Sequence, residues 1–77
     1  MNKERRKSLS ALRAQLDNVK AELEAIRDEE QDAFDNMPEG LQQSERGEAS
    51  EEAIRLIADA LESIETATEN IDEVADG

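Results

Sequence analysis

The chain has 77 residues, of which 39% are charged and 36% hydrophobic, and 21 acidic residues against nine basic ones give a formal net charge of −12. It contains no His, Cys, Trp or Tyr, and Phe34 is the single aromatic residue. These absences exclude His-based acid–base catalysis, thiol nucleophiles, disulfides, the usual zinc sites and aromatic stacking on bases. Because so acidic a chain repels phosphates, we also expect no direct binding to nucleic acid.

We expect one small domain, with the cytoplasm as its default location. The chain has no apolar run of about 18 residues or more, so we expect no membrane-spanning helix. Its basic start, with Arg5, Arg6 and Lys7, is not followed by the apolar segment of a signal peptide. A domain this short, without disulfides or metal, needs regular helices or a partner chain.

The first half predicts a helix over residues 3–36, because its apolar residues recur at alternating spacings of three and four. Heptad row a contains Leu9, Leu16, Leu23 and Glu30, and row d contains Leu12, Val19, Ile26 and Ala33. Pro38 ends this helix, and Asn36 to Gly40 has the composition of a turn. We expect the turn over residues 37–44.

The second half predicts a helix over residues 45–75, for which Ser44 and Ser50 are both plausible N-caps. Its row a contains Ile57, Ile64 and Ile71, and its row d contains Ala53, Ala60, Ala67 and Val74. Ile54 and Leu61 at position e, with Leu56 at position g, widen the apolar stripe beyond what one partner helix covers.

Two such helices predict an all-α fold, an antiparallel two-helix coiled-coil hairpin with rows a and d in the seam. The wide stripe on the second helix needs a further partner. We expect hairpins to pair into a homodimeric four-helix bundle, or the stripe to dock on a different protein. The apolar contacts are then made by Phe34, Ile54, Leu56 and Leu61.

Charge divides the hairpin into two unlike ends. Residues 1–13 hold five basic groups and one acidic group, and we expect Glu69, Asp72, Glu73 and Asp76 to lie beside them. Between Glu22 and Glu52, twelve acidic groups and two Arg leave a charge of −10. This acidic tip is either a solvated face or a surface for a basic partner. Its candidate residues are Asp28, Glu29, Asp32, Asp35, Glu45, Glu48, Glu51 and Glu52.

Motifs for metal binding or catalysis are incomplete. Residues 28–39 place oxygen side chains at several EF-hand positions, but Ala33 stands where that loop needs Gly. The carboxylate pairs Glu48/Glu51 and Glu69/Asp72 lie on one helix and point outward, so they do not converge on a metal. We expect no catalytic residue, no metal site and no cofactor.

The central segment Glu29-Glu30-Gln31-Asp32-Ala33-Phe34-Asp35-Asn36-Met37-Pro38-Glu39-Gly40-Leu41-Gln42, followed by Ser44-Glu45-Arg46-Gly47-Glu48, resembles a signature of short acidic helical-hairpin proteins of bacteria and phages. The resemblance implies a mobile-element accessory protein with a hairpin fold, acting in the host cytoplasm, and no particular activity.

Three functions remain open on the sequence. The primary hypothesis is a non-enzymatic module that binds a basic-surfaced host protein. The alternative is a partial DNA mimic that inhibits a nucleic-acid-binding host protein such as a defence nuclease or regulator. A purely structural assembly subunit would need only the seam residues.

Overall fold

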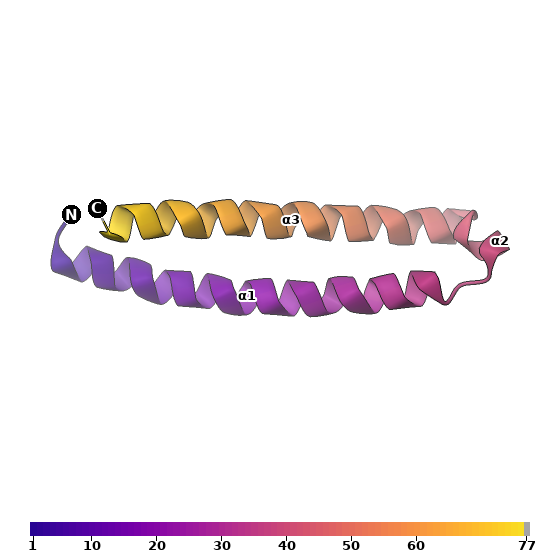
Figure 1. Cartoon of the computed structure of the whole chain (residues 1–77), viewed down its shortest axis with the longest axis horizontal. Coiled ribbons are helices and arrows are strands. Elements are labelled where there is room, and N and C mark those ends of the chain that lie inside the picture. Colours follow the sequence, from indigo (N-terminus) through magenta and orange to yellow (C-terminus); the bar gives the residue numbers. More distant parts are fainter. Residues whose placement is uncertain (77) are drawn as a thin grey trace.

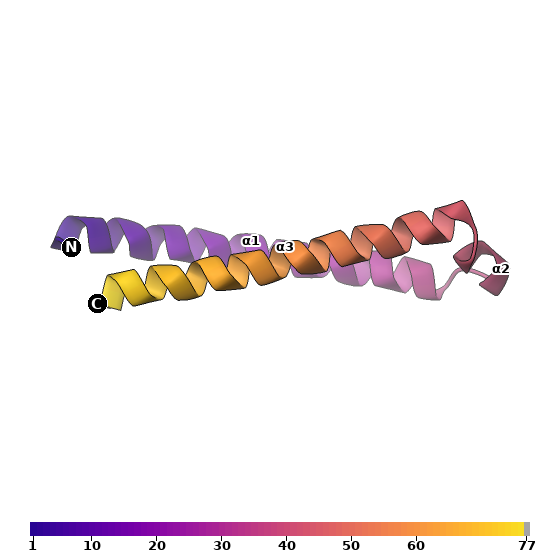
Figure 2. The ribbon, with the colours of Figure 1, turned by 90° about the horizontal axis from the view of Figure 1, so that it is seen from above.

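The computed structural model describes residues 1–76 and is all-helical over that range. Two long helices, α1 (Lys3–Asp35) and α3 (Glu45–Asp76), pack side by side, and a short helix, α2 (Glu39–Gln42), lies between them at the turn. The rod measures 58 × 14 × 13 Å, with both termini at the end opposite α2 (Figure 1). Seen from above, the long helices cross at a shallow angle (Figure 2). The expected helical hairpin is therefore present.

The helix ends follow from capping residues. The Asn2 side chain accepts a hydrogen bond from the Arg5 backbone N–H at 2.8 Å and caps the first turn of α1. Asn36 ends α1, because its backbone and side-chain N–H groups both donate to the Asp32 carbonyl. The Ser44 carbonyl accepts from the Glu48 N–H at 2.9 Å, so Ser44 begins α3, whereas Ser50 lies buried within that helix.

The turn contains a helical element that the sequence did not predict. Pro38 precedes α2, and its carbonyl accepts hydrogen bonds from the Leu41 and Gln42 N–H groups. The Gln42 side chain donates to the Phe34 carbonyl at 3.0 Å, which ties α2 back to the end of α1. The predicted open turn is thus a compact, hydrogen-bonded connection.

The seam between the long helices differs from the predicted one. Apart from Glu24 and Gln31 in row b, the half-buried side chains of α1 alternate between row a and row e. Row e contains Arg6, Arg13, Lys20, Arg27 and Phe34. On α3 the seam likewise combines row a with row e, which contains Gly47, Ile54, Leu61, Thr68 and Ala75. The prediction that row d of α1 lies in the seam is wrong: Leu12, Val19 and Ile26 are exposed.

The side chains of α3 explain this rotation. Its row d is largely Ala, whereas its row e supplies Ile54 and Leu61, so turning row e inward buries the larger apolar side chains of α3. Leu61 is 7% exposed and is the only buried hydrophobic residue among residues 1–76. The opposing basic side chains of α1 can line this seam because their aliphatic stems pack while their charged ends reach water.

Gly47 allows close packing between α2 and the first turn of α3. A Cβ atom added there would lie 2.1 Å from the Gln42 carbonyl oxygen and 2.6 Å from that of Leu41. Both neighbours are backbone atoms, which cannot move aside as a flexible side chain can.

We predict that Gly47→Ala destabilises the hairpin by about 1–3 kcal/mol, because the added methyl group overpacks this contact. Gly40→Ala is the matched control: Gly40 also lies in a helix, and a Cβ there meets nothing within 4 Å. That control should be neutral or stabilising by up to about 1 kcal/mol. Urea unfolding followed by circular dichroism measures both. Equal stabilisation by the two substitutions would contradict the close approach of α2 and α3.

We predict that Leu61→Ala costs about 2–3 kcal/mol, because it leaves a cavity in the seam. Leu56→Ala removes the same atoms from a side chain outside the seam and should cost less than about 1 kcal/mol. Both are measured by urea unfolding at low protein concentration. Similar losses of stability for the two variants would contradict the burial of Leu61 and the exposure of Leu56.

Candidate functional site

The seam has two edges, and one ion pair across it shows which heptad rows of α1 and α3 lie along the same edge. The Arg13 guanidinium donates to the Asp72 carboxylate at 2.7 Å and also pairs with Asp17 on its own helix. Asp17 and Asp72 both occupy heptad position b. The b flanks of α1 and α3 therefore lie on the same side of the hairpin, and their d flanks share the opposite side.

The pairing with Asp72, and then the charge of Asp17, raises the pKa of Arg13 above its ordinary value. The midpoint of the chain between Arg13 and Asp72 falls between residues 42 and 43, within the turn predicted over residues 37–44. This register places Leu12 nearly level with Val74, and Val19 with Ala67.

The side formed by rows d and g carries little charge between residues 8 and 26 of α1 and between residues 49 and 74 of α3, and we call this stretch the open face. Its large apolar side chains are exposed: Leu12 50%, Val19 42%, Ile26 52%, Leu56 53% and Val74 46%. Glu22 is the one charged residue of this stretch, although 39% of the chain is charged; Arg5, Glu29 and Arg46 occupy the same rows beyond its ends. The open face consists of Ser8, Leu12, Gln15, Val19, Glu22 and Ile26 on α1 and Ala49, Ala53, Leu56, Ala60, Ser63, Ala67, Asn70 and Val74 on α3.

The predicted apolar contacts are divided between the seam and the surface. Ile54 and Phe34 are half-buried, and Leu61 is buried in the seam, so the hairpin itself already packs these side chains. Leu56 alone of the four is exposed. The side chains available to a partner are instead mostly those of row d, which sequence reasoning had assigned to the seam. The signal for this rotation was on α3, where row e contains Ile54 and Leu61 and row d is largely Ala.

All eight residues of the acidic tip are exposed. Asp28 pairs with Arg27 at 3.1 Å, Asp35 accepts from the Gln31 side chain at 2.9 Å, and Glu52 pairs with Arg55. Within residues 1–76 no group of three or more acidic side chains converges to hold a metal ion. The tip is thus a region of dispersed negative charge and has no chelating geometry.

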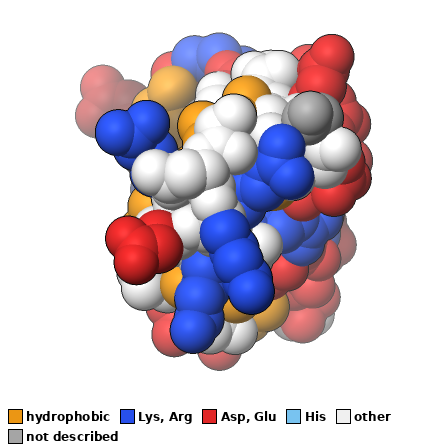
Figure 3. Space-filling view, turned by 90° about the vertical axis from the view of Figure 1, so that its left-hand side faces the viewer, with side chains coloured by type: hydrophobic (Ala, Val, Ile, Leu, Met, Phe, Trp, Pro, Cys, Tyr) orange, Lys and Arg blue, Asp and Glu red, His pale blue; other side chains and the backbone are white. Residues whose placement is uncertain are grey.

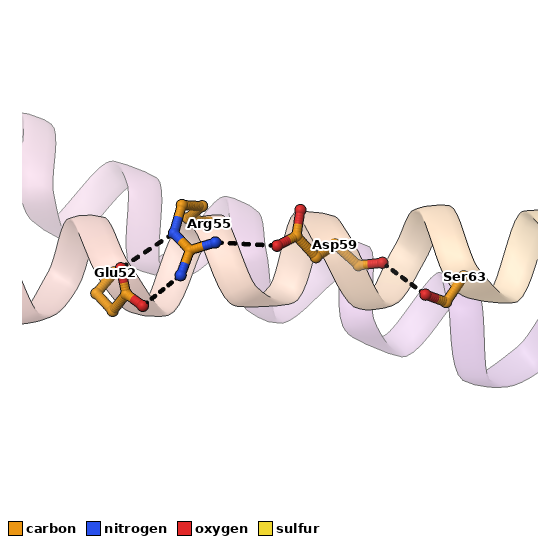
Figure 4. A network of polar contacts seen from close by, with 4 residues as sticks. All are labelled: Glu52, Arg55, Asp59 and Ser63. Carbon is orange, nitrogen blue, oxygen red and sulfur yellow. Dashed lines mark hydrogen bonds and ion pairs between the residues drawn. The ribbon is translucent and has the colours of Figure 1, made fainter.

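Glu52 belongs to a polar network along the outer surface of α3 (Figure 4). Arg55 joins Glu52 one turn before it to Asp59 one turn after it, and the Ser63 hydroxyl donates to the Asp59 carbonyl at 3.1 Å. The hydrogen bond from Arg55 lowers the pKa of Glu52, and the same contact raises the pKa of Arg55. Because every member lies on α3, the network supports that helix without contacting α1.

The end of the rod that carries both termini presents a group of basic side chains, which Figure 3 shows in blue. Acidic residues of α3 were expected to lie beside these basic side chains, but only Arg13 forms an ion pair with one of them, Asp72. Among the described residues, Lys3, Arg5, Arg6 and Lys7 form no ion pair within 4.0 Å. The Nε atom of Arg6 is buried without a hydrogen-bond partner.

Comparison with known proteins identifies no relative: no family model, curated protein or solved structure matches this chain. No helix within residues 1–76 is long and apolar enough to cross a membrane. The function must therefore be argued from the surfaces described above.

We predict a stabilising coupling between Arg13 and Asp72 in a double-mutant cycle with Arg13→Ala and Asp72→Ala. Both side chains are more than a third exposed, so the coupling should be small and should shrink in 1 M NaCl. Urea unfolding at both salt concentrations measures it. The cycle of Arg13 with Asp17 tests the contact within α1, and a coupling found only there would contradict the cross-helix register.

Proposed function

We propose that this chain is a non-enzymatic protein-binding module that docks through its open face. The observation that carries this proposal is the exposure of Leu12, Val19, Ile26, Leu56 and Val74 on one nearly uncharged side of a highly charged rod. Contiguous apolar surface on a small soluble domain marks an interaction site, because leaving it in water is costly. The lack of His and Cys supports a binding role over a catalytic one.

The acidic tip gives the module a preference for partners with basic surfaces. Exposed charge of one sign raises the rate at which an oppositely charged protein arrives, although it adds less to the final affinity. Apolar contact at the open face then supplies the stability of the complex. Action on a host protein in the cytoplasm, as a phage or mobile-element accessory protein, rests on the resemblance of the turn segment alone.

Partial DNA mimicry has weaker support. A net charge of −12 spread along the 58 Å rod amounts to about one charge per 5 Å, whereas duplex DNA carries one per ~1.7 Å. The rod therefore offers a nucleic-acid-binding site much less charge than DNA does. Mimicry also leaves the apolar side chains of the open face without a role.

We predict that Leu12→Glu/Ile26→Glu abolishes capture of a partner from bacterial lysate, because each substitution puts a charge on the apolar docking surface. Both residues are exposed, so the helices should still form. Ala14→Glu/Ala21→Glu adds the same charge to the exposed outer side of α1 and is the matched control. Tagged proteins are compared by pull-down and mass spectrometry.

The expected result is a protein retained by the unmodified chain and by the Ala14/Ala21 variant, and lost with the Leu12/Ile26 variant. Slower capture at high salt is expected if the acidic tip steers the encounter, because salt screens long-range charge. Retention of the same proteins by all three forms would contradict docking through the open face.

A further inference from the structure

We propose that the occupant of the open face is a second copy of this chain, packed antiparallel to form a four-helix bundle with the two turns at opposite ends. This inference rests on the proposed function, because it keeps docking through the open face and assigns a second copy of this chain, in place of a basic-surfaced protein, as the occupant. It differs from the dimer expected on the sequence in its contacts, since row d of both helices replaces Ile54 and Leu61.

The exposed area of the hairpin supports a partner of this size. A compact monomer of 8.6 kDa would expose about 4,700 Å², whereas this chain exposes 5714 Å². The excess of about 1,000 Å² is close to the ~800 Å² that each partner buries in a standard protein interface. A two-helix rod has a single internal seam, and pairing two rods adds the second layer that a helical domain needs.

The residues of row d fit a twofold axis perpendicular to the rod. In that arrangement α1 packs on α1 of the partner, and α3 packs on its counterpart. Val19 is the central residue of α1 and lies nearly level with Ala67, so an axis through this level lets the α1 helices overlap fully. Leu12 then meets Ile26 of the partner subunit, and Val19 meets the partner's Val19.

The contact between the two α3 helices fits because the side chains in row d of α3 are small. Ala67 lies near the axis and faces the partner's Ala67, and Ala60 faces the partner's Val74. Small side chains let two helices approach closely, so the α3 pair can lie close together while larger side chains fill the space between the α1 helices.

Charge selects the antiparallel orientation over the parallel one. With the axis at Val19, the end of α1 that carries Lys3, Arg5, Arg6 and Lys7 comes level with the acidic end of α1 in the partner subunit, so the two ends attract through their overall charge and not through contacts between the d rows. These basic side chains form no ion pair within the described hairpin. Parallel packing would instead bring together two turn ends that each carry −10 between Glu22 and Glu52.

Single-cysteine variants test both the partner and its orientation, because the chain contains no cysteine. Under mild oxidation, Val19→Cys should form a covalent dimer with a yield about tenfold above that of Ala21→Cys, since only a pair held by the interface has a high effective concentration. Ala21 lies on the exposed outer side of α1. Leu12→Cys and Ile26→Cys should each stay monomeric alone and cross-link when mixed.

Light scattering of the unmodified chain should give about twice the 8.6 kDa chain mass at micromolar concentration, and Leu12→Glu/Ile26→Glu should give the monomer. A monomeric unmodified chain would overturn the inference. So would cross-linking of Val19→Cys to Ala67→Cys, but not to itself, since that pattern indicates parallel packing.

The two proposals fail separately. A monomer that still captures another protein through the open face overturns the second copy and leaves the proposed function standing. Conversely, the cysteine variants can cross-link into a dimer while Leu12→Glu/Ile26→Glu still captures the same proteins from lysate. That pair of results supports the second copy and overturns docking of the lysate proteins through the open face.

Discussion

A hairpin of two helices has only one seam, and this constraint determines the rest of the structure. Helix α3 carries apolar residues in three heptad rows, a, d and e, and α1 carries them in rows a and d, whereas a single neighbouring helix covers about two rows. One row must remain outside. In the structure, rows a and e form the seam, because the large apolar residues beside row a of α3 are Ile54 and Leu61 of row e.

That choice gives the two flanks of the hairpin different chemistry. On the b flank, Asp17 and Asp72 pair with the charged end of Arg13, so this side is polar and carries the ion pair that joins the two helices. On the d flank, apolar and small residues meet water. A rod with one polar and one apolar flank is suited to bind along its length, and its acidic turn end adds long-range attraction toward basic surfaces.

The connection between the helices fixes this arrangement. Gly47 lets the backbone of α2 approach the first turn of α3, and Gln42 ties α2 to the end of α1. A compact turn limits how far either helix can rotate or slide relative to the other. The same register that forms the seam therefore also brings the two d rows to nearly the same level, which makes the open face continuous.

Much of the fold could be predicted because it depends on local periodicity and capping. Alternating spacings of three and four identify both long helices, and Pro38 separates them. Helix α2 was not predicted, since four residues are too few to show a period. The exposed acidic residues of the candidate site were identified correctly as surface, because a dense run of carboxylates cannot be buried. The residues that make the apolar contacts were not identified correctly, because the rotation of the seam buries Leu61 inside it and leaves Leu12 exposed on the surface.

The sequence by itself determined the helices, their antiparallel order and the uneven distribution of charge, because each follows from residue types at fixed spacings. Only the tertiary structure decided which apolar row lies inside. Rows d and e both adjoin row a, so a helix presents either one after a small rotation about its axis. The choice depends on the side chains of the opposite helix, namely the Ala residues in row d of α3 against Ile54 and Leu61 in its row e.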